Sequence, residues 1–257
     1  MAPDEHPLTG GNVTSAVVRV GDTVRRPAGP WTPAVHALLG YLRSAGFSGA
    51  PEPLGLDDQG REVLRFIPGV VPWPEHFELL GPPAQLARAA RLIRDFHDAV
   101  AGFIPPPDAR WQVNIPADNY EIIAHHDLAP WNLVVGNQWA LIDWNNAAPG
   151  SRLWDLAYAI HGFIPLSADP RFHPVDSDAR LRTFVDAYGL HDEPDRRQLL
   201  DLLGPRARSM YRFLAHQAAI NVDPWAKLWR EGHGDVWRND ADYIDNHRAR
   251  WQAALLG

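Results

Sequence analysis

The residues HHDLAPWN (125–132), followed by LVV (133–135), GN (136–137) and ALIDW (140–144), decide the fold of this chain. A polar run with two imidazoles, a carboxylate and a carboxamide opens into two short apolar runs, which a Gly-Asn turn separates. This pattern predicts a loop that leads into a β-hairpin. The hairpin would return Asp143 to the side of Asn132, with Asp127 a few residues upstream.

The polar residues of this stretch suit phosphate chemistry with a hard cation. Asn132 and Asp143 offer the oxygen ligands that Mg²⁺ binds when phosphate oxygens and water complete its shell. Asp127 would stay off the metal and accept a proton. Two other interpretations are open: Asp-x-x-x-x-Asn is also typical of a capped turn, and His125 and His126 with Asp127 would suit a transition metal in a hydrolase.

The spacing of Asp127, Asn132 and Asp143 resembles the catalytic loop and metal-binding aspartate of kinase-like folds. Together with GSRLWDLA (150–157), it resembles the aminoglycoside phosphotransferase and choline kinase family more than protein kinases. The resemblance implies an α+β, bilobal protein-kinase-like fold. Residues 1–67 would form a small, β-rich nucleotide-binding lobe, and residues 68–257 a larger, mainly helical lobe with the catalytic and acceptor-binding residues.

The same resemblance implies an activity. The enzyme would transfer the γ-phosphate of ATP or GTP, with Mg²⁺, to a hydroxyl of an aminoglycoside-like, amino-alcohol or sugar acceptor. Asp127 would be the catalytic residue, and Asn132 and Asp143 would hold the metal. Asp155 would tie the catalytic segment to the helix beneath it, and His125 would brace the loop through hydrogen bonds.

The chain departs from this family at the phosphate-binding lysine. The predicted strand 23–26 holds that lysine in the family, but the only lysine of this chain is Lys227. Arg25 is the best match and Arg26 the alternative, and strand alternation sends the two side chains to opposite faces. An arginine would clamp phosphate with a bidentate fork.

The partner of that lysine is also missing from its usual place. The family carries a glutamate on the helix expected at residues 32–45, whereas this helix has no acid and has His36 near that position. The two losses motivate a second hypothesis, in which the chain is a binding protein on a degenerate kinase fold with weak or no phosphotransfer.

Further nucleotide contacts follow from the resemblance. Gly11 and Thr14 would lie over the phosphates, where glycine lets the backbone approach and leaves N–H groups exposed. The backbone of Arg65, Phe66 and Ile67 would form the hinge against the adenine edge, before a Pro-rich linker at 68–74.

Apolar residues at three- and four-residue spacing predict helices over 83–100, 156–163, 179–188, 196–219 and 236–256. The closing segment is rich in tryptophan and acids. Aromatic walls with carboxylates would suit an amine-bearing acceptor, although tryptophans at helical spacing are also typical of a core and acids of a solvated face. His97 is expected to be satisfied within the core.

Composition narrows the class of protein. A net charge of −7 argues against nucleic-acid binding. The lack of cysteine excludes disulfides and thiolate metal sites. No apolar run approaches the ~20 residues of a membrane span, and the first residues do not resemble a signal peptide. We therefore expect a cytoplasmic protein without membrane partners, and the sequence leaves its oligomeric state open.

Overall fold

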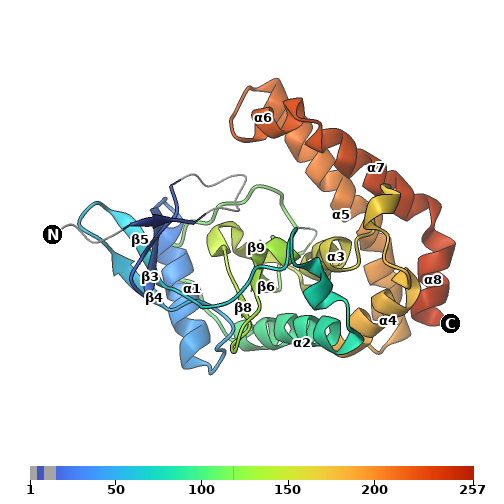
Figure 1. Cartoon of the computed structure of the whole chain (residues 1–257), viewed down its shortest axis with the longest axis horizontal. Helices are drawn as coiled ribbons and strands as arrows, with labels where there is room; N and C mark the ends of the chain where they lie inside the picture. Colours follow the sequence, from blue (N-terminus) through green and yellow to red (C-terminus); the bar gives the residue numbers. More distant parts are fainter. Residues whose placement is uncertain (1–4, 9–15, 118) are drawn as a thin grey trace.

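The computed structural model describes residues 5–8, 16–117 and 119–257. Figure 1 shows a β-sheet with one helix at the N-terminal end of the molecule and a larger group of helices at the other end. Short strands and the segment that decides the fold lie between the two. The predicted mixture of a β-rich part and a mainly helical part is therefore confirmed.

The N-terminal part is an antiparallel sheet of five strands in the order β1-β2-β3-β5-β4. The strands are β1 (His6–Pro7), β2 (Val18–Val20), β3 (Thr23–Pro27), β4 (Pro53–Leu56) and β5 (Arg61–Arg65). A tight turn at Gly21, which has a φ of +59°, joins β2 to β3 as the Gly-Asp pair predicts. Neither β1 nor β4 was predicted from the sequence.

Helix α1 (Thr32–Ser44) packs its apolar face toward this sheet. Val35, Leu38, Leu39 and Leu42 recur at helical spacing and are fully buried. The face of the sheet that meets α1 is therefore an interior face. In the pairing of β3 with β5, Val24 lies opposite Leu64, and Arg26 lies opposite Glu62.

The segment at 122–150 forms two small antiparallel pairs. One pair is the predicted hairpin of β7 (Leu133–Val134) and β8 (Ala140–Leu141). The other joins β6 (Ile122–Ala124) to β9 (Ala148–Gly150) and was not predicted. The short helices η2 (Pro130–Asn132) and η3 (Trp144–Asn146) lie before and after the hairpin.

The helical part contains the predicted helices with shifted ends. Helix α2 (Pro83–Val100) agrees with its predicted bounds. The interval expected to be one helix over 236–256 is divided at His247, whose backbone leaves the helical path. The remaining helices are η1 (Phe77–Leu80), α3 (Arg152–Phe163), η4 (Pro170–Phe172), α4 (Ser177–Tyr188), α5 (Glu193–Ala219), α6 (Trp225–Arg230), α7 (His233–Asn246) and α8 (Arg248–Leu256).

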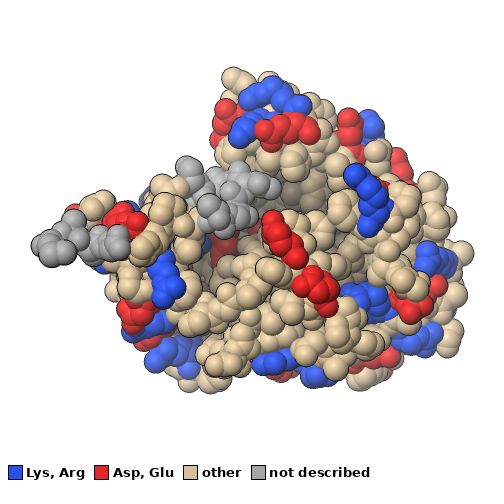
Figure 2. Space-filling model, in the orientation of Figure 1, with Lys and Arg blue, Asp and Glu red and all other residues tan. Residues whose placement is uncertain are grey.

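Basic and acidic side chains are mixed on the face of the molecule seen in Figure 2. Figure 2 shows lysine and arginine interspersed with aspartate and glutamate over the described part of this face, without a continuous basic patch. Among the described residues, no helix combines the length and apolar character that crossing a bilayer requires.

Candidate active site

Asp155, on the first turns of α3, holds the catalytic segment in place. Its two carboxylate oxygens accept the backbone N–H groups of His125 and His126, both at 2.8 Å, and the Nε2–H of His97 at 3.2 Å. Burial by itself raises the pKa of Asp155, but the hydrogen bond from His97 and the neighbouring imidazoles lower it to about 2. The side chain is fully buried and ionised, and it ties the loop to α3 as predicted.

His125 stabilises the loop through hydrogen bonds to the backbone. Its Nδ1 accepts the backbone N–H of Asp127 at 3.3 Å, so Nε2 carries the proton and donates to the carbonyl of Ile142 at 3.1 Å. Burial lowers the pKa of His125, which favours this neutral form. The bond to Ile142 also links the loop to the end of the hairpin.

Two residues of the segment have left-handed backbone conformations. His126 has a φ of 65°, and Asp143 has a φ of 60° and a ψ of 65°. Non-glycine residues adopt this region only when the surroundings hold them there, and such residues concentrate at functional sites. Behind Asp143, the buried Trp144 donates its indole N–H to Leu141 and packs edge-on against Phe96.

Asn132 lies against Asp127, and the hairpin brings Asp143 to the same place. The Nδ2 of Asn132 donates to the carboxylate of Asp127 at 2.8 Å and to its carbonyl at 2.9 Å. The amide is thereby oriented, and its opposite end, Oδ1, is the one that can bind a cation. The backbone N–H of Ile142 donates to the carbonyl of Asn132 at 2.8 Å, which sets Asp143 one residue beyond it.

Asp127 has an environment that sequence reasoning did not anticipate. Burial raises its pKa from 3.8 to about 7 and the charge of Asp143 adds to this rise, while hydrogen bonds from Tyr158 and Asn132 oppose it. Behind Tyr158 lies the buried Arg206 of α5, whose guanidinium carbon is 4.3 Å from the centre of the tyrosine ring. Arg206 also donates to the carbonyl of His126 at 3.1 Å.

The structure corrects the choice between the two arginines of β3. Arg26 lies on the interior face, where its Nη1 donates to Asp143 at 2.9 Å and its Nε to Glu62. Arg25 lies on the opposite face and pairs with Asp57 at 3.4 Å. The expectation that Arg25 points into the site is therefore wrong. Side chains alternate along β3, and the face that meets α1 carries Val24 and Arg26, so Arg25 lies on the other face.

The other predicted nucleotide contacts are only partly located. Gly11 and Thr14 lie outside the described residues. The N–H groups of Arg65 and Phe66 bond within the sheet, to the carbonyls of Glu52 and Asp22, both at 2.8 Å. The backbone N–H groups of Arg65 and Phe66 therefore already have hydrogen-bond partners within the protein. The hinge contact with the adenine edge stays a prediction for the backbone of Ile67, which is half-buried.

The site suits a hard cation better than a transition metal. In the described part of the chain, no group of three or more His, Cys, Asp or Glu side chains is arranged to hold a metal ion. His126 directs its Nε2 to the backbone carbonyls of Ala148 and Pro149, at 3.2 and 3.3 Å. The imidazoles of His125 and His126 therefore form hydrogen bonds with backbone carbonyls. The ligands left for a cation are the side-chain oxygens of Asn132 and Asp143, and oxygen is the ligand atom that Mg²⁺ prefers.

The acids of the closing helices are engaged by the protein itself. Four of the acids form ion pairs: Glu231 with Lys227, Asp235 with Arg238, and both Asp242 and Asp245 with Arg208. The fifth, the buried Asp240, accepts hydrogen bonds from His161, Ser167 and the backbone N–H of Ala168. Trp225 and Trp229 pack on Phe213 and Tyr211 of α5. These tryptophans and acids are structural in the described chain.

Aromatic rings nevertheless extend from the catalytic loop. The ring of Trp131, between Asp127 and Asn132, lies 6.5 Å from that of Tyr158 and 6.3 Å from that of Trp73. Tyr158 stacks on Trp237 at 5.8 Å, and Trp73 lies 5.6 Å from Phe172. We call Trp73, Trp131, Tyr158, Phe172 and Trp237 the aromatic wall.

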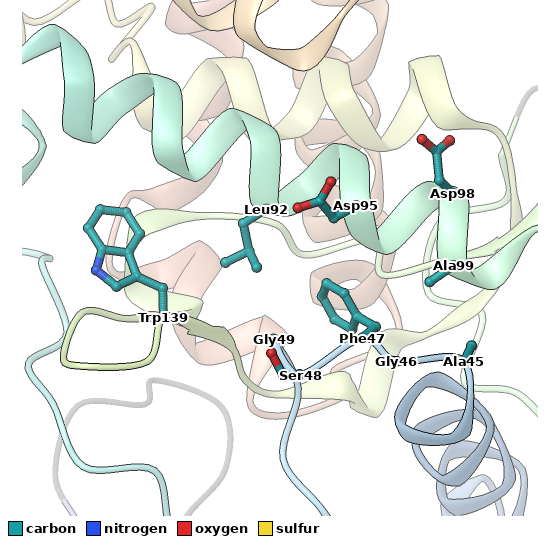
Figure 3. Close-up of a pocket in the computed structure, with 10 residues that line it drawn as sticks. All are labelled: Ala45, Gly46, Phe47, Ser48, Gly49, Leu92, Asp95, Asp98, Ala99 and Trp139. Carbon is teal, nitrogen blue, oxygen red and sulfur yellow. The ribbon is translucent and has the colours of Figure 1, made fainter.

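A cavity of about 400 Å³ lies away from these residues. Figure 3 shows it between α2, the loop that follows α1 and the hairpin turn, with Leu92, Phe47 and Trp139 directed from these three elements. Its acids do not form a free pair, because Asp98 binds Arg94 and Arg152. None of the predicted site residues lines it, so the candidate site remains the catalytic segment.

Comparisons with known proteins agree with this geometry. The model of the phosphotransferase enzyme family matches residues 108–202. The trifolitoxin immunity protein of Rhizobium leguminosarum bv. trifolii is 32% identical over 98% of this chain and 99% of its own length. This chain belongs to the phosphotransferase enzyme family. It is accordingly an enzyme of the class that phosphorylates alcohol groups.

Solved structures show the same fold at low identity. A choline/ethanolamine kinase family protein from Mesorhizobium loti is 18% identical and superposes with a TM-score of 0.66, covering 98% of this chain and 92% of its own. An amicoumacin kinase solved with AMP-PNP and Ca²⁺ is 12% identical with a TM-score of 0.63, covering 91% and 88%. The protein-kinase-like fold of the family, predicted from the resemblance of residues 125–157, is thereby confirmed.

Proposed function

We propose that this phosphotransferase transfers the γ-phosphoryl group of a nucleoside triphosphate to a hydroxyl of a small molecule. The observation that carries the proposal is the convergence of Asp127, Asn132 and Asp143 with Arg26 at one point. Residues 1–67 would hold the nucleotide, and residues 68–257 would hold the acceptor. An amicoumacin kinase that binds AMP-PNP and Ca²⁺ on this fold supports a nucleotide with a divalent cation.

Each residue has a distinct role in this proposal. Bound Mg²⁺ would neutralise phosphate charge, and Asn132 and Asp143 are the residues that would hold it. Asp127 would orient the acceptor hydroxyl and accept its proton, since its carboxylate is fixed by Asn132 and Tyr158. Arg26 would bind phosphate, because its Nη2 is buried without a hydrogen-bond partner among the described residues.

The acceptor is proposed to be recognised mainly through its apolar or aromatic body. The aromatic wall adjoins Asp127, and the nearby acids that would attract a polycationic amino sugar are already paired. The 32% identical relative is named for immunity to trifolitoxin, which supports an antibiotic or toxin as acceptor. A quaternary or simple amino alcohol would use the same rings through cation–π contact and is the alternative.

Calorimetric titration with ATP and with GTP, each with and without Mg²⁺, tests the nucleotide site. Asp143→Asn should abolish the Mg²⁺-dependent part of binding, whereas the exposed Asp95→Asn on α2 serves as a matched control. Asp127→Asn should keep nucleotide binding and reduce transfer by about 100-fold or more. Binding of neither nucleotide by the unmodified protein would contradict the proposal and favour the degenerate-fold hypothesis.

The acceptor class is tested by a coupled kinase assay on three groups of alcohols. These are aminoglycosides, choline-like amino alcohols and hydroxylated antibiotics with apolar or aromatic bodies. We expect turnover of the third group and a KM for that acceptor that rises in Trp131→Ala and Trp73→Ala. Preferential turnover of a polycationic aminoglycoside would contradict this assignment of the acceptor.

A further inference from the structure

The site contains a buried acid, Glu62, that was not among the predicted site residues. Glu62 lies on β5, directly across the strand pair from Arg26, and its side chain is 1% exposed. The helix α1, which carries the acid in the family, has none. A negative charge therefore still lies beside the basic residue of β3, but it comes from β5 and not from α1.

The guanidinium of Arg26 divides its donors between different groups. Nε donates to Oε2 of Glu62, and Nη1 donates to Oδ1 of Asp143 at 2.9 Å. Nη2 is buried and has no hydrogen-bond partner among the described residues. Because the group is planar and its donors point in fixed directions, binding at Nε and Nη1 determines where Nη2 points.

The other oxygen of Glu62 connects this arrangement to α1. Nε2 of His36 lies 2.9 Å from Oε1 of Glu62, so one carboxylate joins β3, β5 and α1. Burial by itself raises the pKa of Glu62, but the hydrogen bond with His36 and the charge of Arg26 lower it below its usual value. Glu62 therefore remains an anion between the two basic groups.

We propose that Glu62 and His36 are positioning residues, which hold Arg26 so that Nη1 stays on Asp143 and Nη2 meets the nucleotide phosphates. This inference rests on the proposed function, in which Arg26 binds phosphate. In this proposal Arg26, Glu62 and His36 together replace the lysine–glutamate pair that binds the nucleotide phosphates in the family. A lysine at position 26 would not replace the arginine, since one ammonium at the end of a flexible stem cannot occupy three fixed directions.

The proposal differs from a purely structural ion pair in what it predicts for ligands. Loss of a purely structural ion pair would lower the stability of the protein and would change the affinities for ATP and adenosine by the same factor. A positioning role acts through the phosphates, so ATP should lose affinity while adenosine should not. We therefore compare the dissociation constants of both ligands, by calorimetry with Mg²⁺, in the full-length protein.

Arg26→Lys and Glu62→Gln should each weaken ATP binding about tenfold or more, the size expected for one charge-assisted hydrogen bond, and change adenosine binding less than about twofold. Arg25→Lys, on the opposite face of the same strand, is the matched control for Arg26. Glu52→Gln, whose carboxylate pairs with Arg43 and Arg65 near the surface, is the control for Glu62. Both controls should bind ATP like the unmodified protein.

His36 gives an independent test, which also serves if Glu62→Gln lowers the folded fraction in thermal unfolding. His36→Gln can still donate to Glu62 and should retain most of the ATP affinity, whereas His36→Leu should weaken it. The double variant Arg26→Lys with Glu62→Gln should lose no more than Arg26→Lys alone, because Glu62 acts through Arg26.

Three results would overturn the inference while leaving the proposed function intact. These are ATP affinity unchanged in Glu62→Gln, equal affinity in His36→Gln and His36→Leu, and losses that add in the double variant. Failure of the unmodified protein to bind either ATP or GTP would instead overturn the proposed function, and this inference with it. The two failures are therefore distinguishable in one set of titrations.

Discussion

Replacing Asp155 with asparagine should loosen the catalytic segment and lower the stability of the whole protein. The carboxylate accepts two backbone N–H groups and one imidazole N–H, from His125 and His97, which are buried, and from His126, which is half-buried. Asparagine has almost the same shape, but it offers a single acceptor oxygen and turns an NH₂ group toward donors. At least one of the N–H groups of His125 and His126 would lose its partner.

The size of the effect follows from the pKa of Asp155, which is lowered from 3.8 to about 2 in the folded protein. At about 1.4 kcal/mol for each pH unit, this difference corresponds to about 2–3 kcal/mol of unfolding free energy at pH 7. Because the folded pKa lies below the unfolded value, the unfolded chain binds more protons as the pH falls. The stabilisation is thus complete above about pH 5 and is lost between about pH 4 and pH 2.

The assay is urea unfolding of the wild type and of Asp155→Asn at pH 7, 5, 4 and 3, with the exposed Asp95→Asn as control. The stability difference should be about 2 kcal/mol or more at pH 7, and it should shrink below pH 4. A difference under about 1 kcal/mol, the value of one ordinary hydrogen bond, would refute the reasoning. So would a difference that stays constant from pH 7 to pH 3.

Three further substitutions probe the same segment. Tyr158→Phe removes the hydroxyl that bonds Asp127, so kcat should fall about tenfold with nucleotide affinity unchanged; a change confined to nucleotide affinity would contradict this role. Gly150→Ala places a methyl group 2.8 Å from the ring of His126, and we expect transfer to fall more than it does in the control Gly40→Ala, which adds a methyl group to the exposed side of α1 with no atom within 4 Å. In Gly69→Ala the added carbon meets Val135 of the hairpin at 2.6 Å, and thermal unfolding should show a loss of about 1–3 kcal/mol; an unchanged melting temperature would count against that contact.

Local sequence was sufficient where the site is built from neighbouring residues. The hairpin and the return of Asp143 to Asn132 were predicted from spacing within one segment, and the attachment of the loop to Asp155 followed from the family resemblance. The helix at 83–100 followed from a regular apolar period, and residues 125–157 were enough to identify the family. Fixed spacing predicts geometry well at short range because few conformations of the backbone join such residues.

Tyr158 and Arg206 escaped prediction because their roles depend on packing between distant helices. In the sequence Tyr158 is one more apolar position of α3, and Arg206 is an arginine within a long helix. A buried arginine with no carboxylate partner in the described chain is evident only once α3 and α5 are placed against the catalytic loop.

The sequence by itself determined the family and the reaction class, and it predicted Asn132 and Asp143 as metal-binding residues and Asp127 as the proton acceptor. Only the tertiary structure decided which arginine of β3 enters the site and which acid accompanies it. Strand alternation sends Arg25 and Arg26 to opposite faces, but the interior face is chosen by where α1 packs. The acid was assigned to α1 because the family has it there, whereas Glu62 reaches Arg26 from β5 through cross-strand register, a contact that no local pattern encodes.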